Sequence, residues 1–301
     1  MRRKALLALA VLTLAAAITV VLEQRLRPPT ERTTAYPTMI TDDEGVTSTV
    51  SAAPMRIVSL APQFTETIFA VGVGARLVGV SAGESYPPEA TALPKMTSAD
   101  GLTPDVQLIV EARPDLVLAS GMPSAAWKAQ LRNSGIPVVT FNANGVDDAL
   151  NDIETVGRLV DRADEADAIT RKVRGVITRL SNAPDAKRPS VFVVSFNSPL
   201  YEADSGGYIE DLVGKAGGRL VAASGGGGAS SVTLDQVNSL VPERCIVPES
   251  AGQPQTIFTG TGPCANGQGV LVLKDDLLFR PGPRIATALD TIARFLGVQQ
   301  A

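Results

Sequence analysis

Between residues 146 and 180 the chain repeats apolar side chains every three or four positions, and Gly157 and Gly175 are its only helix-weakening residues. This spacing places the apolar side chains on one face of an α-helix and predicts a single helix over 146–182, about 52 Å long. Such a helix is too long for a crossover inside one small domain. We therefore expect it to join two compact lobes.

Short strands and helices alternate on both sides of this segment. Strands are predicted over 56–61, 77–80, 116–119, 137–141, 191–196, 220–222, 245–247 and 270–273, and helices over 64–71, from Thr103 (with Thr103 as N-cap), and over 123–133, 208–216, 233–240 (capped by Thr233) and 283–296. This alternation is typical of parallel sheets covered on both faces. We predict an α/β fold of two lobes with parallel sheets, 55–145 and 183–301, joined by the backbone helix 146–182.

The first 27 residues have the composition of an export signal. Three basic residues precede an apolar run over 5–22, and Glu23 and Arg25 end it. As a helix the run spans about 27 Å, so a cleaved signal peptide and an uncleaved membrane anchor both remain open. Either places the rest of the chain outside the cytoplasm. Residues 28–54, rich in Thr, Pro and Ser, are predicted to form a flexible linker.

The composition excludes several classes of function. The 301 residues are 45% hydrophobic and 19% charged, which is typical of a globular chain, and the sequence has no histidine. Without histidine there is no Ser-His-Asp triad, Cys-His pair or His-ligated metal. The formal net charge of the whole chain is -4, although residues 1–32 hold six Lys or Arg and only two Glu. The rest of the chain is therefore acidic, which argues against nucleic-acid binding.

An exported hydrolase would need paired carboxylates. Glu84, Glu202 and Asp204 are the candidates, but no spacing between them indicates a catalytic pair. We expect no enzyme activity, no catalytic residue, no metal and no cofactor.

The two cysteines, Cys245 and Cys264, both lie on the exported side. Paired cysteines in an oxidising compartment are expected to form a disulfide. Two buried free thiols are the alternative, and the absence of a C-x-x-C spacing disfavours a redox pair.

Several segments together resemble one family. The segments 56–62, 65–66, 77–80, 86–88 and 113–117, followed by 233–237 and 280–284, are similar in order and spacing to periplasmic cobalamin and iron-siderophore binding proteins of ABC importers. The resemblance covers about residues 55–298. It implies two lobes with a helical backbone, a ligand in the cleft between them, and lobe tips that dock on a membrane permease. We expect a monomer that binds a small molecule.

The resemblance also implies ligand-binding residues. Tyr86 matches a loop that lines the cleft, and Tyr201 matches a position where cobalamin binders place an aromatic ring. Asp276 and Arg280 match an acid and a base that reach the ligand's amides, and Arg280 could alternatively hold a siderophore carboxylate. The alternatives are a packed turn residue for Tyr86 and a local surface ion pair for Asp276 and Arg280.

The chain also departs from the family pattern. Cobalamin binders carry tryptophans on both cleft walls, whereas the matching stretches here are 97–101 and the glycine loop 225–228, which have no ring. The sole tryptophan, Trp127, is predicted to pack on a helix. Haem binders place a tyrosine near Ser98, and the related zinc and manganese receptors need histidines, so both of those ligands are disfavoured. A cobalamin-like corrinoid or a ferric siderophore remains.

In the resembling proteins a carboxylate at each lobe tip meets arginines of the permease. Asp235 matches the carboxyl-lobe position, while Gln107 occupies the amino-lobe position and Asp105 lies two residues before it. Both aspartates have a local alternative, because acids in the first turn favour the helix dipole. The predicted function is an extracytoplasmic receptor that delivers its ligand to an ABC permease. The alternative is a membrane-anchored structural or sensory module that keeps the fold without transport.

Overall fold

The computed structural model describes residues 33–121, 126–181, 188–203, 205–225, 228–253, 257–258, 264–265, 267 and 269–298. The predicted signal peptide or anchor over 1–27 and the carboxylate of Asp204 lie outside these residues. Within the described part of the chain, no helix combines the length and the apolar character needed to cross a membrane.

The amino lobe is built on a parallel sheet of four strands in the order β4-β3-β5-β6. Its strands are β3 (Ile57–Ser59), β4 (Leu77–Val80), β5 (Leu116–Ser120) and β6 (Val138–Phe141), and its helices are α2 (Pro62–Ala70), α3 (Pro88–Thr91), α4 (Val106–Glu111) and α5 (Ala126–Asn133). The strands are short apolar runs, as expected for a sheet covered on both faces. Trp127 packs in the core beneath α5, as predicted.

The carboxyl lobe has a second, mainly parallel sheet in the order β11-β10-β7-β8, with β9 also paired to β7. Its elements are β7 (Ser190–Asn197), β8 (Leu200–Glu202), β9 (Arg219–Leu220), β10 (Arg244–Pro248), β11 (Val270–Leu273), α8 (Tyr208–Lys215), α9 (Leu234–Ser239), α11 (Asp275–Leu278) and α12 (Ile285–Leu296). Only β8 runs antiparallel to its neighbour, because it returns from β7 as a hairpin. The two-lobe α/β prediction is confirmed.

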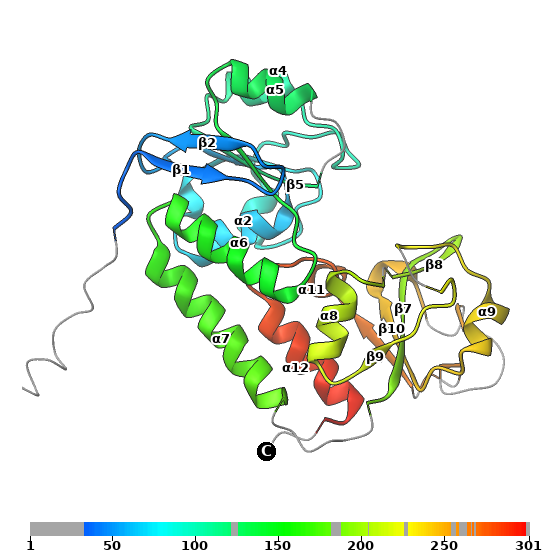
Figure 1. The fold of residues 1–301 in the computed structure, drawn as a ribbon. Coiled ribbons are helices and arrows are strands. Elements are labelled where there is room, and N and C mark those ends of the chain that lie inside the picture. Colours follow the sequence, from blue (N-terminus) through cyan, green and yellow to red (C-terminus); the bar gives the residue numbers. More distant parts are fainter. Residues whose placement is uncertain are drawn as a thin grey trace, which may run out of the picture. The chain divides into compact units, whose positions relative to one another are not determined.

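The single helix predicted over 146–182 is instead two helices, α6 (Val146–Leu159) and α7 (Ala163–Ser181), which pack against each other (Figure 1). Asp161, between them, has a left-handed backbone with φ 58°. At Gly157 a Cβ would lie 2.3 Å from the Ala166 side chain, so only glycine permits this close approach. The apolar spacing continues through the turn, and the sequence pattern therefore hid the break.

The predicted linker over 28–54 is wrong for its described part. Residues Thr38–Thr41 (β1) and Thr47–Val50 (β2) form an antiparallel hairpin that lies on the amino lobe (Figure 1). Asp42 accepts a hydrogen bond from Arg132 at 3.0 Å, and the buried Lys128 pairs with Glu44. These long-range contacts, which a Thr- and Ser-rich composition does not reveal, hold the hairpin in place.

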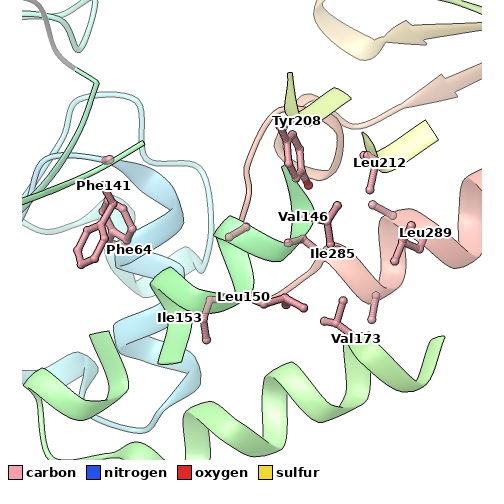
Figure 2. Packing of buried hydrophobic residues seen from close by; sticks show 14 of the residues in the cluster. Phe64, Phe141, Val146, Leu150, Ile153, Val173, Tyr208, Leu212, Ile285 and Leu289 are labelled. Atoms are coloured by element: carbon pink, nitrogen blue, oxygen red, sulfur yellow. The ribbon is translucent and has the colours of Figure 1, made fainter. Parts of the chain in front are cut away.

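A continuous apolar core runs through α2, α6, α7, α8 and α12. Figure 2 shows Val146, Leu150, Val173 and Leu289 pointing toward one another from three of these helices. In Figure 1 α7 lies beside α12, and the two helices are in contact. Residues of both lobes therefore share one core, and the segment 33–301 forms a single compact unit.

Three local predictions can be compared directly with the structure. The disulfide between Cys245 and Cys264 is confirmed, with 5.8 Å between the two Cα atoms. The cap of α9 is also confirmed, because Thr233 and Gln236 form a capping box. The predicted cap at Thr103 is wrong: α4 begins three residues later, and the Asp105 carboxylate accepts a hydrogen bond from the Leu108 amide.

Candidate functional site

A pocket of about 360 Å³ opens at the carboxyl ends of the amino-lobe strands β3, β4 and β5. This is the edge at which parallel α/β sheets bind ligands, because the loops that follow the strands converge there. Its lining includes Gln63, Ser81, Gly83, Asp100 and Leu102. Leu60, Ala61, Pro62 and Leu102 make much of this wall apolar, and the one charged side chain among its described lining residues is the acid Asp100.

A second pocket, of about 390 Å³, lies where the two lobes meet. The amino lobe contributes Ser85, and the carboxyl lobe contributes Glu249, Lys274, Asp275, Asp276, Phe279 and Arg280. The loop over 81–85 lines both pockets, so we treat them together and call them the cleft. Asp276 and Arg280, two of the predicted ligand-binding residues, are brought together here.

Arg280 does not form an ion pair with Asp276. Its guanidinium reaches the amino lobe, where Nη1 donates to Glu66 Oε1 at 3.1 Å. Its Nη2 donates to the Gly83 carbonyl at 3.0 Å and to Ser85 Oγ at 2.8 Å. The arginine therefore ties the carboxyl lobe to the loop that lines both pockets.

Arg284, four residues later in the turn before α12, binds the same glutamate. Its Nε and Nη2 donate to Glu66 at 2.8 and 2.7 Å, and Nη2 also pairs with Asp276 at 2.9 Å. Burial lowers the pKa of Arg284, but the hydrogen bonds to Glu66 and Asp276 outweigh it and raise the pKa above its usual value. We call Glu66, Asp276, Arg280 and Arg284 the interlobe charge cluster.

Sequence reasoning missed the role of Glu66. Its side chain is only 2% exposed, although it is a carboxylate, and it accepts hydrogen bonds from two arginines more than 200 residues away. The available signal was an acid on the buried face of α2 together with two arginines four residues apart. A buried charge needs partners, and these were the candidates.

Tyr86 lies beside the cleft rather than in its lining. The side chain is 42% exposed, and the Arg284 guanidinium lies over its ring at 4.1 Å from the centroid. Together with Phe69 and Pro283, the ring lines a separate pocket of about 290 Å³. The Tyr86 ring therefore has a contact beyond its own turn, because Arg284 belongs to the carboxyl lobe.

Tyr201 lies on β8 and is not among the residues that line the cleft. It stands opposite Phe196 in the β7–β8 pairing, so the two rings share one face of the hairpin. Phe196 is 55% exposed, although it follows a run of buried residues in the same strand. Sequence reasoning missed this exposed ring, because the run reads as a buried strand to its end.

The loop beneath the amino-lobe wall contains a buried carboxyl group. Glu84 Oε1 accepts hydrogen bonds from the hydroxyls of Thr65 at 2.9 Å and Ser81 at 3.0 Å. Burial raises the pKa of Glu84 above its ordinary value. The other hydrolase candidate, Glu202, is also buried and accepts hydrogen bonds from the amides of Ala223 and Ser224. Glu202 thus holds the loop that leads to the glycine-rich segment.

The two lobes, their shared core and a cleft at the strand ends define a two-lobe ligand-binding protein. The described residues contain no group of three or more His, Cys, Asp or Glu side chains that could hold a metal ion. The model of the family described as periplasmic binding protein matches residues 57–263. The chain therefore belongs to the periplasmic binding protein family.

Known relatives span the same two lobes. A vitamin B12-binding protein of Pectobacterium carotovorum is 28% identical over 80% of this chain and 88% of its own length. An uncharacterized ABC transporter substrate-binding lipoprotein of Bacillus subtilis is 25% identical over 87% of this chain and 86% of its own length. Their names agree with an extracytoplasmic, substrate-binding role, and the comparisons give no support to a structural or sensory module.

Solved structures have the same fold. The periplasmic vitamin B12 binding protein BtuF of Vibrio cholerae superposes with a TM-score of 0.71 at 23% identity, over 82% of this chain and 98% of that one. The periplasmic heme-binding protein RhuT of Roseiflexus gives a TM-score of 0.70 at 23% identity, over 80% and 97%. The predicted two-lobe architecture is thereby confirmed.

Proposed function

We propose that this protein is an extracytoplasmic receptor that delivers a cobalamin-like corrinoid or a ferric siderophore to the permease of an ABC importer. The observation that carries the proposal is the cleft, which lies at the carboxyl ends of the amino-lobe strands and at the junction with the carboxyl lobe. The vitamin B12-binding relatives support a corrinoid. Export by either a signal peptide or an anchor belongs to the proposal.

Capture requires no chemistry on the ligand. The buried carboxyls of Glu84 and Glu202 are engaged by hydroxyl and amide donors, and neither lies beside the other as a catalytic pair. Isothermal titration of the full exported body with cobalamin, cobinamide and ferric siderophores tests the proposal. Saturable binding of one of them supports it, while heat signals no different from buffer for the whole panel would count against it.

In the proposed complex, Asp276 and Arg280 contact the ligand's amides in the pocket where the lobes meet. The exposed ring of Tyr86 and the half-buried ring of Tyr201 are further contacts, and Phe196 adds an exposed ring on the face of the β7–β8 hairpin that Tyr201 shares. An aromatic ring lies well against a flat macrocycle.

We expect Arg280→Ala to weaken ligand binding tenfold or more, because a hydrogen bond from a charged group contributes about 1.5–3 kcal/mol. The dissociation constant of the variant, measured by titration calorimetry, checks this. Arg294→Ala, in the last turn of α12, is the matched control and should bind as the wild type does. Equal constants for all three proteins would remove Arg280 from the site.

The proposed permease contacts differ between the lobes. Asp105 caps α4 through the Leu108 amide at 3.0 Å, and this local role accounts for its position. Asp235 lies exposed in the first turn of α9, where Thr233 rather than Asp235 provides the cap. The proposed contact with the permease therefore rests mainly on Asp235, because Asp105 already has a local role as the cap of α4.

Asp235→Lys should reduce complex formation with the permease while leaving ligand affinity and Tm nearly unchanged. The loss should be larger at low ionic strength, because the reversed charge repels permease arginines most strongly there. Binding to permease in detergent or nanodiscs at two salt concentrations measures it, with Asp235→Asn as the milder control. Wild-type affinity at both concentrations would end the docking claim.

A further inference from the structure

The charges that line the cleft do not cancel. The interlobe charge cluster, with two acids and two arginines, is balanced and internally paired. Outside it, the described lining residues of the two pockets include three acids, Asp100, Glu249 and Asp275, against one base, Lys274. The cleft therefore carries a negative excess on both of its walls.

Arg280 offers little compensation for this excess. Its Nη1 is directed to Glu66 and its Nη2 to Gly83 and Ser85, so both terminal nitrogens already have acceptors from the amino lobe. Binding a carboxylate in a bidentate manner would require these hydrogen bonds to break. The geometry thus disfavours the siderophore-carboxylate role that the sequence left open for Arg280. A single amide carbonyl of the ligand can still accept from Nε or from the second hydrogen of Nη1, which have no acceptor among the described residues.

Two of these acids accept hydrogen bonds from nearby backbone amides. Asp100 accepts a hydrogen bond from the Leu102 amide at 2.9 Å, and the Ser98 hydroxyl, its strongest partner, lowers the pKa of Asp100. Asp275 accepts a hydrogen bond from the Ser250 amide at 3.0 Å. The hydrogen bonds that Asp100 accepts therefore favour its ionised form.

We propose that the cleft selects ligands that carry hydrogen-bond donors and no net negative charge, and rejects polyanions. The inference rests on the proposed function and narrows its ligand class to an amide-bearing corrinoid or a cationic iron chelate. Haem, with two propionates, and anionic tris-catecholate iron complexes fall outside this class. Like charges facing one another across an interface are a recognised means of rejecting wrong partners.

The direct experiment compares two forms of one macrocycle. Cobinamide carries side-chain amides, and its hydrolysed form carries carboxylates in their place, so shape is kept while charge is changed. We expect the full exported protein to bind the amide form at least about tenfold more tightly at low salt. The ratio should shrink at high salt, because exposed charges are screened. A cationic hydroxamate–iron complex and an anionic catecholate–iron complex form the second arm.

Variants identify the residues responsible. The triple change Asp100→Asn, Asp275→Asn and Glu249→Gln should lower the ratio of the two affinities several-fold. The control triple, Asp147→Asn, Asp148→Asn and Glu111→Gln, makes the same change in net charge on residues that do not line either pocket, and its ratio should match the wild type.

The outcomes separate the two proposals. Binding of the carboxylate form or the catecholate complex as tightly as its partner would overturn charge selection and leave the receptor function intact. An equal fall in the ratio for both triples would also overturn it, because the effect would then come from total charge. Failure of every compound to bind would overturn the receptor function together with the inference.

Discussion

Glu66→Ala should lower the free energy of unfolding by about 2–4 kcal/mol, because it leaves two half-buried guanidinium groups without their shared carboxylate. The Arg280 and Arg284 side chains keep only part of their surface in water, so hydration cannot replace the lost partner fully. A fall in Tm of roughly 5–10 °C is expected for a chain of this size. Urea or thermal unfolding followed by circular dichroism measures the loss.

Two further variants test whether the charge cluster is the cause. Glu89→Ala removes an exposed glutamate that lines the same side pocket as Glu66, and it should change stability by less than about 0.5 kcal/mol. The double variant Glu66→Ala, Arg284→Ala should lose less than the sum of its single changes, because each removes the same contact. Full additivity would contradict the proposed coupling between the lobes.

The sequence predicts the sheets well because their strands are coded locally. Short apolar runs such as 116–119 and 138–141 have few alternatives to a buried parallel strand, and the helices between them follow the same rule. The disulfide was predictable for a similar reason, since it needs only two exported cysteines. In each of these cases the deciding information lies within a few residues or in the composition.

The features that were missed depend on long-range contacts. The turn between α6 and α7 is set by the close approach of Gly157 to Ala166, which becomes visible only when both helices are in place. The β1–β2 hairpin is polar in sequence, and its order comes from partners such as Arg132 on α5. Glu66 likewise finds its arginines at the other end of the chain.

Only part of the candidate site could be predicted from the sequence, because the rest depends on long-range contacts. Asp276 and Arg280 lie four residues apart, so a local motif places them in one pocket. Tyr201 and Tyr86 lie on different lobes, and motif matching could not foresee that the Tyr86 ring rests on Arg284. The charge excess of the cleft was also hidden, because Asp100, Glu249 and Asp275 come from three segments that are far apart in the sequence.

Asp152→Asn should stabilise the protein at neutral and alkaline pH. Asp152 is 8% exposed on α6, and burial, followed by the nearby carboxylates of Asp43 and Asp148, raises the pKa of Asp152 to about 7. None of these influences favours the anion. In the unfolded chain an aspartate has a pKa of about 3.9. Between about pH 4 and pH 7, Asp152 is therefore protonated in the folded state and ionised in the unfolded state.

The sign of the pH dependence follows from this difference. A group whose pKa is raised by folding makes the folded state less stable as pH rises from about 4 to about 7, and the loss is complete above that range. The asparagine variant lacks this loss. Its free energy of unfolding should exceed that of the wild type by about 1–3 kcal/mol at pH 8, and the two values should converge near pH 4.

Urea unfolding of both proteins at intervals from pH 4 to pH 8 measures the difference between their free energies of unfolding. Groups that titrate alike in both proteins do not contribute to this difference. Asp148→Asn is the matched control, since it makes the same substitution one turn earlier on the exposed side of α6. Its difference from the wild type should stay within about 1 kcal/mol at every pH, because Asp148 is exposed and the change removes both a hydrogen bond from the Asn144 amide at 3.0 Å and the repulsion of Asp152, which act in opposite directions. A constant difference in stability between Asp152→Asn and the wild type across the whole pH range would contradict this prediction. It would mean that the pKa of Asp152 is the same in the folded and unfolded states, in spite of its burial and of the nearby carboxylates of Asp43 and Asp148.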